Sequence, residues 1–291
     1  MKTFLLIEVS IIFWFFLCLF FIRKDRYKLK IFFLSLVFAA IFENFNVILS
    51  KYQAGGYYYN ESFLFFINNT PFFVIASWAM IFLSAFLISD NLNIKERFKP
   101  FSDAVFVFLI DLSVDVIAIR HKLWFWNDYS FSDGFLGVPA NNFIGWLLVA
   151  FTFSLVFRSI FNSKYKNKSL LYLLMPMISY GFFLFLFYFV LFLEKTLNLN
   201  KFTQLFFVLF LFLSFIIVSL FHLTSKKPKS KNNFLIGFIR IPFHFYALLG
   251  LFTLNIYVQN YYMVIVTIFV MFVDIAVHFY TRKIKTLINF F

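Results

Sequence analysis

The chain has 291 residues, of which 63% are hydrophobic and only 13% are charged, and its mean hydropathy is +0.87. Soluble domains are about 45–50% apolar and about 25% charged. This composition excludes a soluble enzyme, a disordered chain and, because Cys18 is the single cysteine, a secreted disulfide scaffold. It predicts an all-α fold, namely a polytopic transmembrane helix bundle.

Nine apolar runs of about 20 residues are candidate spans, and we expect between seven and nine to cross the bilayer. In chain order they are residues 3–22, 31–50, 71–89, 101–119, 141–160, 169–193, 202–223, 234–257 and 262–280. The first lacks a small-residue cleavage site and precedes its positive charge, which indicates a retained helix. We expect one membrane domain over 1–291, with the motifs in region 40–150 and the helices of 169–280 completing the bundle.

The basic residues predict the orientation of the bundle. Nineteen of the 26 Lys and Arg follow the odd-numbered spans, six lie on the other side, and Arg240 lies inside a span. The positive-inside rule therefore places the N-terminus outside and the C-terminus in the cytoplasm of a multi-pass cell-membrane protein. The net charge of +13 belongs to this inner face and suits anionic lipids. No nucleic acid partner is expected, since the charges occupy short loops.

Phenylalanine is unusually frequent, with 53 residues. One explanation is codon bias in a genome rich in A and T. The other is an aromatic-lined cavity for a long hydrocarbon. Composition does not separate the two.

Three acidic residues lie at a similar depth within predicted spans, where ionisable groups are costly and often functional. Glu43 is in the second span, and Asp111 and Asp115 share one face of the fourth through their i, i+4 spacing. All three lie roughly 16–23 Å from the cytoplasmic helix ends. They cannot all be ionised in a low-dielectric site, so we expect a mixed set suited to acid–base catalysis. Hydrogen bonding between neutral acids, or an ion or proton pathway, remains an alternative; Asp103, at a helix start, is expected to be interfacial.

A second polar group is expected between the last two spans. Arg240 and Asp274 lie at similar depths and predict a structural ion pair, with His244 one turn from Arg240. The four histidines are scattered, so we expect no metal site. The absence of a mid-span lysine argues against a retinal Schiff base, and no cofactor is expected.

Four of the five tryptophans fall between residues 78 and 146, within a recognisable order of motifs. The motifs are Asp111-Leu112-Ser113-Val114-Asp115, Trp124-Phe125-Trp126 and Gly137-Val138-Pro139-Ala140-Asn141-Asn142-Phe143-Ile144-Gly145-Trp146, with Glu43, Gly56-Tyr57-Tyr58-Tyr59, Pro71 and Ser77-Trp78 upstream. This order resembles the integral-membrane carotenoid biosynthesis protein family, which includes bisanhydrobacterioruberin hydratases and γ-carotene hydratases. The chain departs from it at Val116, where the family has proline, and at Asn46, where it has glycine.

The resemblance implies a hydratase that adds water to the terminal alkene of an acyclic carotenoid or related long isoprenoid in the membrane. Asp115 would protonate the alkene, and Glu43 or Asp111 would orient the water, although Asp115 and Glu43 could exchange roles. The residues expected to contact the substrate are Tyr57, Tyr59, Trp78, Trp124, Trp126, Asn142 and Trp146. Interfacial anchoring of the aromatic residues, and helix capping by Asn142, are alternatives.

The resemblance also suggests other enzymes of carotenoid biosynthesis as partners. Two other functions that would use the same acidic residues remain alternatives. A cyclase or isomerase would also begin with protonation of an alkene, and a proton-coupled membrane carrier would use the acids as a relay.

Overall fold

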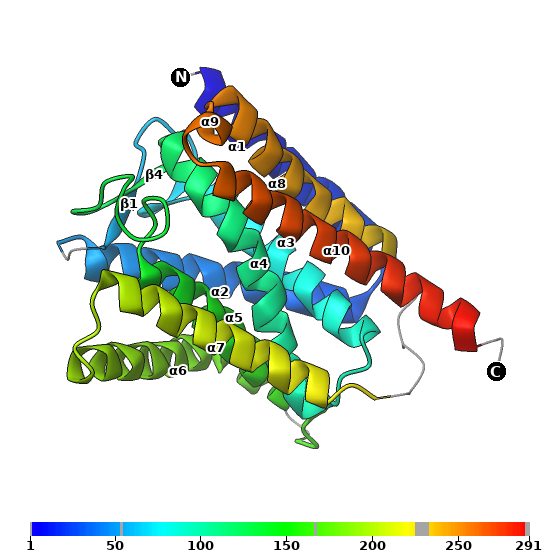
Figure 1. The fold of residues 1–291 in the computed structure, drawn as a ribbon. Helices are drawn as coiled ribbons and strands as arrows, with labels where there is room; N and C mark the ends of the chain where they lie inside the picture. The colour runs from blue at the N-terminus through cyan, green and yellow to red at the C-terminus, as the bar shows by residue number, and fades with distance from the viewer. Residues whose placement is uncertain (1, 53–54, 166–167, 225–232, 289–291) are drawn as a thin grey trace.

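The computed structural model describes residues 2–52, 55–165, 168–224 and 233–288, and these form a helical bundle (Figure 1). The helices among them are α1 (Lys2–Ile22), α2 (Arg26–Ser50), α3 (Phe72–Asn91), α4 (Lys99–Arg120), α5 (Ala140–Asn162), α6 (Lys168–Thr196), α7 (Lys201–Phe221), α8 (Asn233–Thr253), α9 (Ile256–Gln259) and α10 (Tyr261–Ile288), with a 3₁₀ turn at Glu96–Phe98. Eight of the nine predicted spans each correspond to one long helix, and the predicted span 234–257 covers α8 and the start of α9. The prediction of an all-α polytopic bundle is confirmed.

Seven of the described helices, α1–α3 and α5–α8, are long and apolar enough to cross a membrane. The helix α4 is not among them, although it lies at the centre of the bundle against α3, α5, α7, α8 and α10. Its charged residues are Lys99, Asp103, Asp111, Asp115 and Arg120, and they lower its hydropathy. The most charged helix is therefore shielded from the surroundings by its neighbours. The helix α10 is also not among the seven, because its apolar part within the described residues, Tyr261–Ala276, is shorter than the others.

Local capping explains where several helices start and stop. The second begins five residues earlier than predicted because the Asp25 side chain accepts hydrogen bonds from the backbone N–H groups of Tyr27 and Lys28. The predicted span 234–257 instead divides into α8 and α9, because Asn255 adopts a left-handed conformation at φ 52°.

Two short strands join the long loops that follow α2 and α4. The strand β1 (Tyr57–Tyr59) pairs antiparallel with β4 (Trp124–Trp126), and Tyr57 lies opposite Trp126 while Tyr59 lies opposite Trp124. A second pair, β2 (Phe66–Ile67) and β3 (Thr70–Pro71), forms a small turn before α3. Figure 1 shows β1 and β4 at the left, beside the ends of α2 and α4. The pairing fixes two loops, about 65 residues apart in sequence, against each other.

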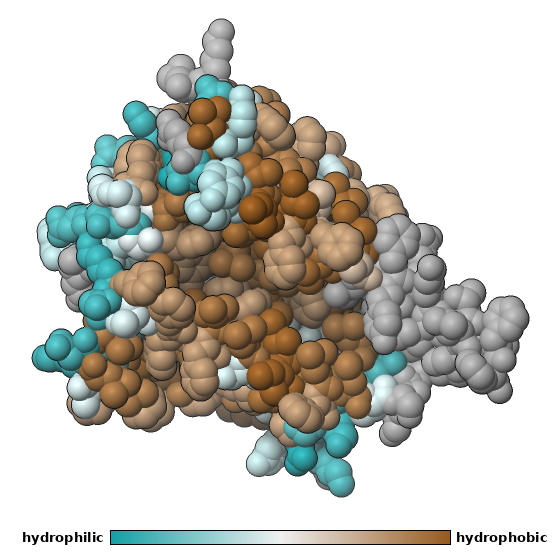
Figure 2. Space-filling model, in the orientation of Figure 1, coloured by the Kyte–Doolittle hydropathy of each residue, from teal (hydrophilic) through white to brown (hydrophobic). Residues whose placement is uncertain are grey.

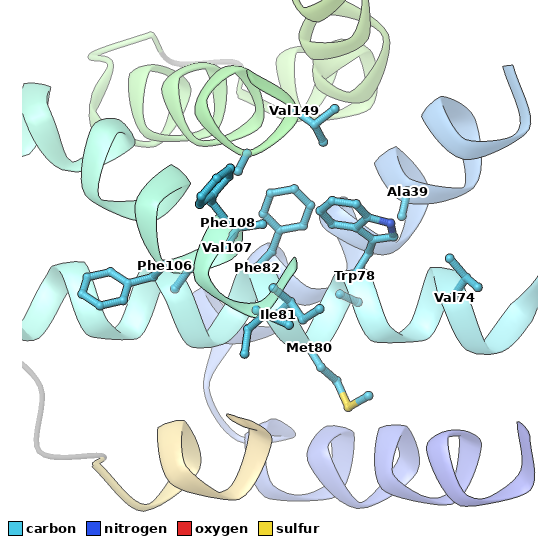
Figure 3. Packing of buried hydrophobic residues seen from close by; sticks show 14 of the residues in the cluster. Ala39, Val74, Trp78, Met80, Ile81, Phe82, Phe106, Val107, Phe108 and Val149 are labelled. Carbon is cyan, nitrogen blue, oxygen red and sulfur yellow. The ribbon is translucent and has the colours of Figure 1, made fainter. Parts of the chain in front are cut away.

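Aromatic rings fill much of the core. Eight of the largest fully buried side chains are phenylalanines: Phe32, Phe38, Phe82, Phe86, Phe108, Phe143, Phe153 and Phe157. Phe82 is a central member, since its ring centroid lies 4.5 Å from that of Phe153 and 5.4 Å from that of Trp78 (Figure 3). Many other phenylalanines are exposed, particularly on α6 and α7. Figure 2 shows hydrophobic side chains over the middle of one face and hydrophilic ones mainly along its left and lower margins, which is the pattern of a protein surrounded by lipid.

A buried ionic cluster joins α3, α4 and α5, and it includes Asp103 in the second turn of α4. Asp103 is fully buried, and its carboxylate lies 2.7 Å from Arg158 Nε and accepts a hydrogen bond from Ser154. Arg158 also lies 2.9 Å from Asp90, which pairs with Lys99 at 2.8 Å. Arg158 is one of the nineteen basic residues assigned to the inner side. Its charge is paired with buried carboxylates, so it connects α5 to its neighbours inside the bundle.

Candidate functional site

A cavity of about 570 Å³ lies between the helices and is lined in part by the β1–β4 pair. Its walls come from α1, α2, α3, α4, α5, α6 and α8, and they are mainly aliphatic and aromatic. The volume is within the range of small-molecule sites, about 300–1,000 Å³. Six of the 53 phenylalanines line it. An aromatic-lined cavity thus accounts for few of the phenylalanines in this chain.

Glu43 lies on the cavity wall and is 5% exposed. Three side chains donate hydrogen bonds to its carboxylate: Tyr57 Oη at 2.6 Å and Tyr59 Oη at 2.7 Å, both to Oε2, and Trp78 Nε1 at 2.6 Å to Oε1. An ionised carboxylate accepts from both oxygens, so this set of donors is satisfied by the charged form. The arrangement places a carboxyl group with three donors inside an apolar cavity, where the donors favour its ionised form and burial opposes it.

Tyr57 and Tyr59 reach Glu43 because β1 brings the loop back over the end of α2. Burial, and then the negative charge of Glu43, raises the pKa of both tyrosines well above the usual value of 10. Both hydroxyls therefore remain protonated at neutral pH and keep donating to Glu43.

The two aspartates of α4 are buried and share one partner. Asn142 Nδ2 donates to Asp115 Oδ2 at 2.6 Å and lies 3.3 Å from each carboxylate oxygen of Asp111. The two carboxyl groups are therefore neighbours in a buried site, where like-charge repulsion and burial both oppose ionisation of the two groups at once. Asn142 thus contacts the acids, while Pro139 occupies the N-cap position of α5.

Only one of these two aspartates reaches the cavity. Asp115 is part of the wall, together with Glu43 and Asn142, whereas Asp111 lies behind it. Since α4 places the two residues one turn apart, Asp111 contacts Asp115 without facing the cavity. Asp115 can therefore contact a bound molecule directly, whereas Asp111 is separated from the cavity.

The predicted aromatic residues gather at the same end of the cavity, which all of them line. Trp78 packs on Trp146 with ring centroids 4.1 Å apart. Tyr57 lies 5.2 Å from Trp126, and Tyr59 lies 6.1 Å from Trp124. Trp126 Nε1 is buried with no hydrogen-bond partner within the described part of the chain, so it is free to donate to a polar atom of a ligand.

Several cavity residues carried no sequence signal. The face of α6 contributes Phe183 and Phe187, and α8 contributes Phe243 and Tyr246. These helices are hydrophobic on most sides, so their sequences do not mark the side that faces a cavity. The acidic residue Glu8 was also missed; its carboxylate accepts from the backbone N–H groups of residues 64 and 65 and holds that loop on α1.

Arg240 and Asp274 lie outside the cavity. Arg240 Nε is 2.6 Å from Asp274 Oδ2, and His244 Nε2 is 2.6 Å from the same oxygen. Arg240 also donates to Ser84 and to the Phe106 carbonyl, so its guanidinium connects α8 to α3, α4 and α10. Within the residues described, no three His, Cys, Asp or Glu side chains converge to hold a metal ion.

A family model described as "Carotenoid biosynthesis protein" matches residues 4–211, well over half of the chain. The match begins in α1 and reaches α7, so it extends beyond the motif region of residues 40–150 on both sides. No curated protein and no solved structure matches the chain.

Proposed function

We propose, from the premise that the chain belongs to the carotenoid biosynthesis protein family, that it is a membrane hydratase acting on an acyclic carotenoid or a related long isoprenoid. The observation that carries the proposal is the placement of two unlike carboxyl groups in one apolar cavity. Asp115 is paired with a second acid, and Glu43 is held by three donors. Hydration of an alkene needs an acid and a base in such a setting.

Asp115 is the acid in this mechanism. It lines the cavity next to Asp111, and because repulsion between two buried carboxylates favours protonation, its protonated form can point at a bound alkene. The π electrons of the alkene take the proton from Asp115 and form a C–H bond, leaving a tertiary carbocation and a carboxylate. Asn142 fixes both aspartates for this step, and Asp111 is a positioning residue.

Glu43 is the base. Its carboxylate and the faces of the neighbouring tryptophans stabilise the positive charge of the carbocation. Water then forms a C–O bond to the cation, and Glu43 accepts the proton that the bound water loses. The product is a tertiary alcohol, and the sum of the steps is one alkene plus one water.

Expression in a host that accumulates an acyclic carotene tests the proposal. We expect a pigment heavier by one water, seen by mass analysis, and its loss in Asp115→Asn while the protein stays inserted. The exposed residue Asp128, changed to Asn, is the matched control and should keep full activity. Product formation by Asp115→Asn at the wild-type rate would exclude Asp115 as the acid.

The same experiment separates the alternative functions. A pigment of unchanged mass and altered absorption would indicate a cyclase or isomerase that uses the same acid. Proton flux in liposomes without conversion of lipid would indicate a carrier.

A further inference from the structure

The cavity has a buried part and an exposed rim. In the buried part, Glu43 and Asp115 are 5% and 2% exposed. Five apolar or aromatic side chains also line the cavity and yet are between 46% and 67% exposed, namely Leu6, Leu49, Tyr188, Phe245 and Leu249. A side chain that borders both the cavity and the surroundings lies at an opening. These five residues, the rim, therefore mark the mouth of the cavity.

The rim lies on helices and not on the connecting loops. Leu6 belongs to α1, Leu49 to α2, Tyr188 to α6, and Phe245 and Leu249 to α8, and all four helices are long and apolar enough to cross a membrane. Exposed apolar side chains of a membrane-spanning helix face the lipid tails. The mouth therefore opens sideways, towards the hydrocarbon of the bilayer.

The packing of these four helices explains why an opening is left between them. The helix α1 is joined to α8, since Trp14 Nε1 donates to the Phe238 carbonyl at 3.0 Å and the two rings stack. The helix α2 is joined to α6, since the Tyr180 hydroxyl donates to Asn46 Oδ1 at 3.1 Å. In Figure 1, α1 and α8 run together and diverge from α2 and α6 towards the side where β1 and β4 lie. The rim consists of residues from both pairs, so the mouth lies between the pairs.

The size of the cavity shows why the mouth matters for a long substrate. A cavity of about 570 Å³ encloses a ligand of drug size. An acyclic carotene is a far larger molecule, with a length comparable to the thickness of the hydrocarbon core, about 30 Å. The cavity can therefore enclose one end of such a chain, and the remainder must leave through an opening.

We propose that only the end of the isoprenoid chain enters the cavity, and that the rest crosses the rim and lies in the bilayer. The inference rests on the proposed function, because it takes a long isoprenoid as the substrate and the buried carboxyl groups as the reacting end of the cavity. The enzyme then recognises the terminal alkene and its near neighbours and does not measure the length of the chain. The competing arrangement is a chain that leaves along the β1–β4 loops, in which case the rim would not touch it.

The test compares two substrates that share the same terminal alkene, lycopene and the much shorter farnesene, with the full chain in lipid nanodiscs. Wild type should add water to both. Leu249→Trp and Leu49→Trp narrow the mouth from α8 and from α2, and each should lower the ratio of kcat/KM for lycopene to kcat/KM for farnesene about 10-fold, because only the longer chain crosses the rim. Leu209→Trp is the matched control, since Leu209 is 48% exposed on α7 and does not line the cavity, and its ratio should equal that of wild type.

The outcomes separate this inference from the proposed function. An unchanged ratio in both Leu249→Trp and Leu49→Trp would overturn the passage of the chain across the rim and leave the hydratase proposal standing. Hydration of lycopene but not of farnesene by wild type would show that the enzyme needs the whole chain, and would overturn recognition of the end alone. No hydrated product from either substrate with wild type would overturn the proposed function itself.

Discussion

At the scale of single residues, the site depends on which groups donate and which accept. Glu43 accepts from three donors, whereas Asp115 shares the amide of Asn142 with Asp111. The same functional group therefore has two different environments, which suit the two roles that we propose. The aromatic rings around both carboxyl groups keep the local dielectric low, which strengthens these differences.

Glu43→Gln tests the role of the accepting carboxylate. The amide removes the negative charge. Its NH₂ group would also face the side chains that donate to Glu43, so two donors would meet with no acceptor between them. We expect carotene turnover to fall by about 10²- to 10⁴-fold and the unfolding free energy to fall by about 1–3 kcal/mol. Assays of product formation and of thermal unfolding in detergent measure the two effects. The exposed Glu61→Gln serves as the control, and equal turnover by the two variants would contradict the assignment of Glu43 as base.

At the scale of elements, α4 is placed by its charges as well as by its apolar residues. Its N-terminal half is held to α5 and α3 through the Asp103–Arg158 pair and Asp90, and its C-terminal half carries Asp111 and Asp115. Both halves need buried partners, since an unpaired charge in an apolar interior is strongly unfavourable. The ionic cluster therefore fixes the rotation of α4 that aims Asp115 at the cavity.

Asp103→Asn should destabilise the bundle without touching the cavity. It leaves Arg158 buried with Asp90 as its nearest remaining carboxylate, and breaking a buried pair costs about 3–5 kcal/mol. Thermal unfolding in detergent should show a lower Tm. The double variant Asp103→Leu with Arg158→Met removes both charges and should recover part of the loss. An unchanged Tm in Asp103→Asn would show that the cluster contributes little.

At the scale of the whole molecule, an apolar bundle with polar ends fits a multi-pass membrane protein of carotenoid biosynthesis. The helices alternate in direction, so the β1–β4 loops and the ionic cluster lie towards opposite ends of α4. The charge pattern then predicts that the loop end, with Glu43 and Asp115, faces outside.

Cysteine labelling in intact cells tests this orientation. The native Cys18 is fully buried in α1 and gives little background. An impermeant maleimide should label Ser132→Cys, in the exposed loop before α5, and should not label Asn162→Cys, at the other end of α5, until the cells are opened. The reverse pattern would overturn the predicted orientation.

Much of the fold and part of the site followed from the sequence. Hydropathy located nine helices, because burial in lipid requires about 20 consecutive apolar residues. The rarity of charge in the spans drew attention to Glu43, Asp111 and Asp115. The motif order added the aromatic residues and Asn142, and all of these except Asp111 line one cavity.

Only the tertiary structure decided which of these groups act together. Helical spacing puts Asp111 and Asp115 on one face, but packing against α5 and the β1–β4 pair makes Asp115 the one that reaches the cavity. Asp103 pairs with Arg158, which is 55 residues away in the sequence. Tyr246 contacts His121, which is 125 residues away. Hydropathy and spacing are local properties of the chain, whereas hydrogen-bond partners and cavity walls depend on how distant helices pack. The sequence by itself therefore determined a membrane bundle with costly acids inside it, and packing decided their partners.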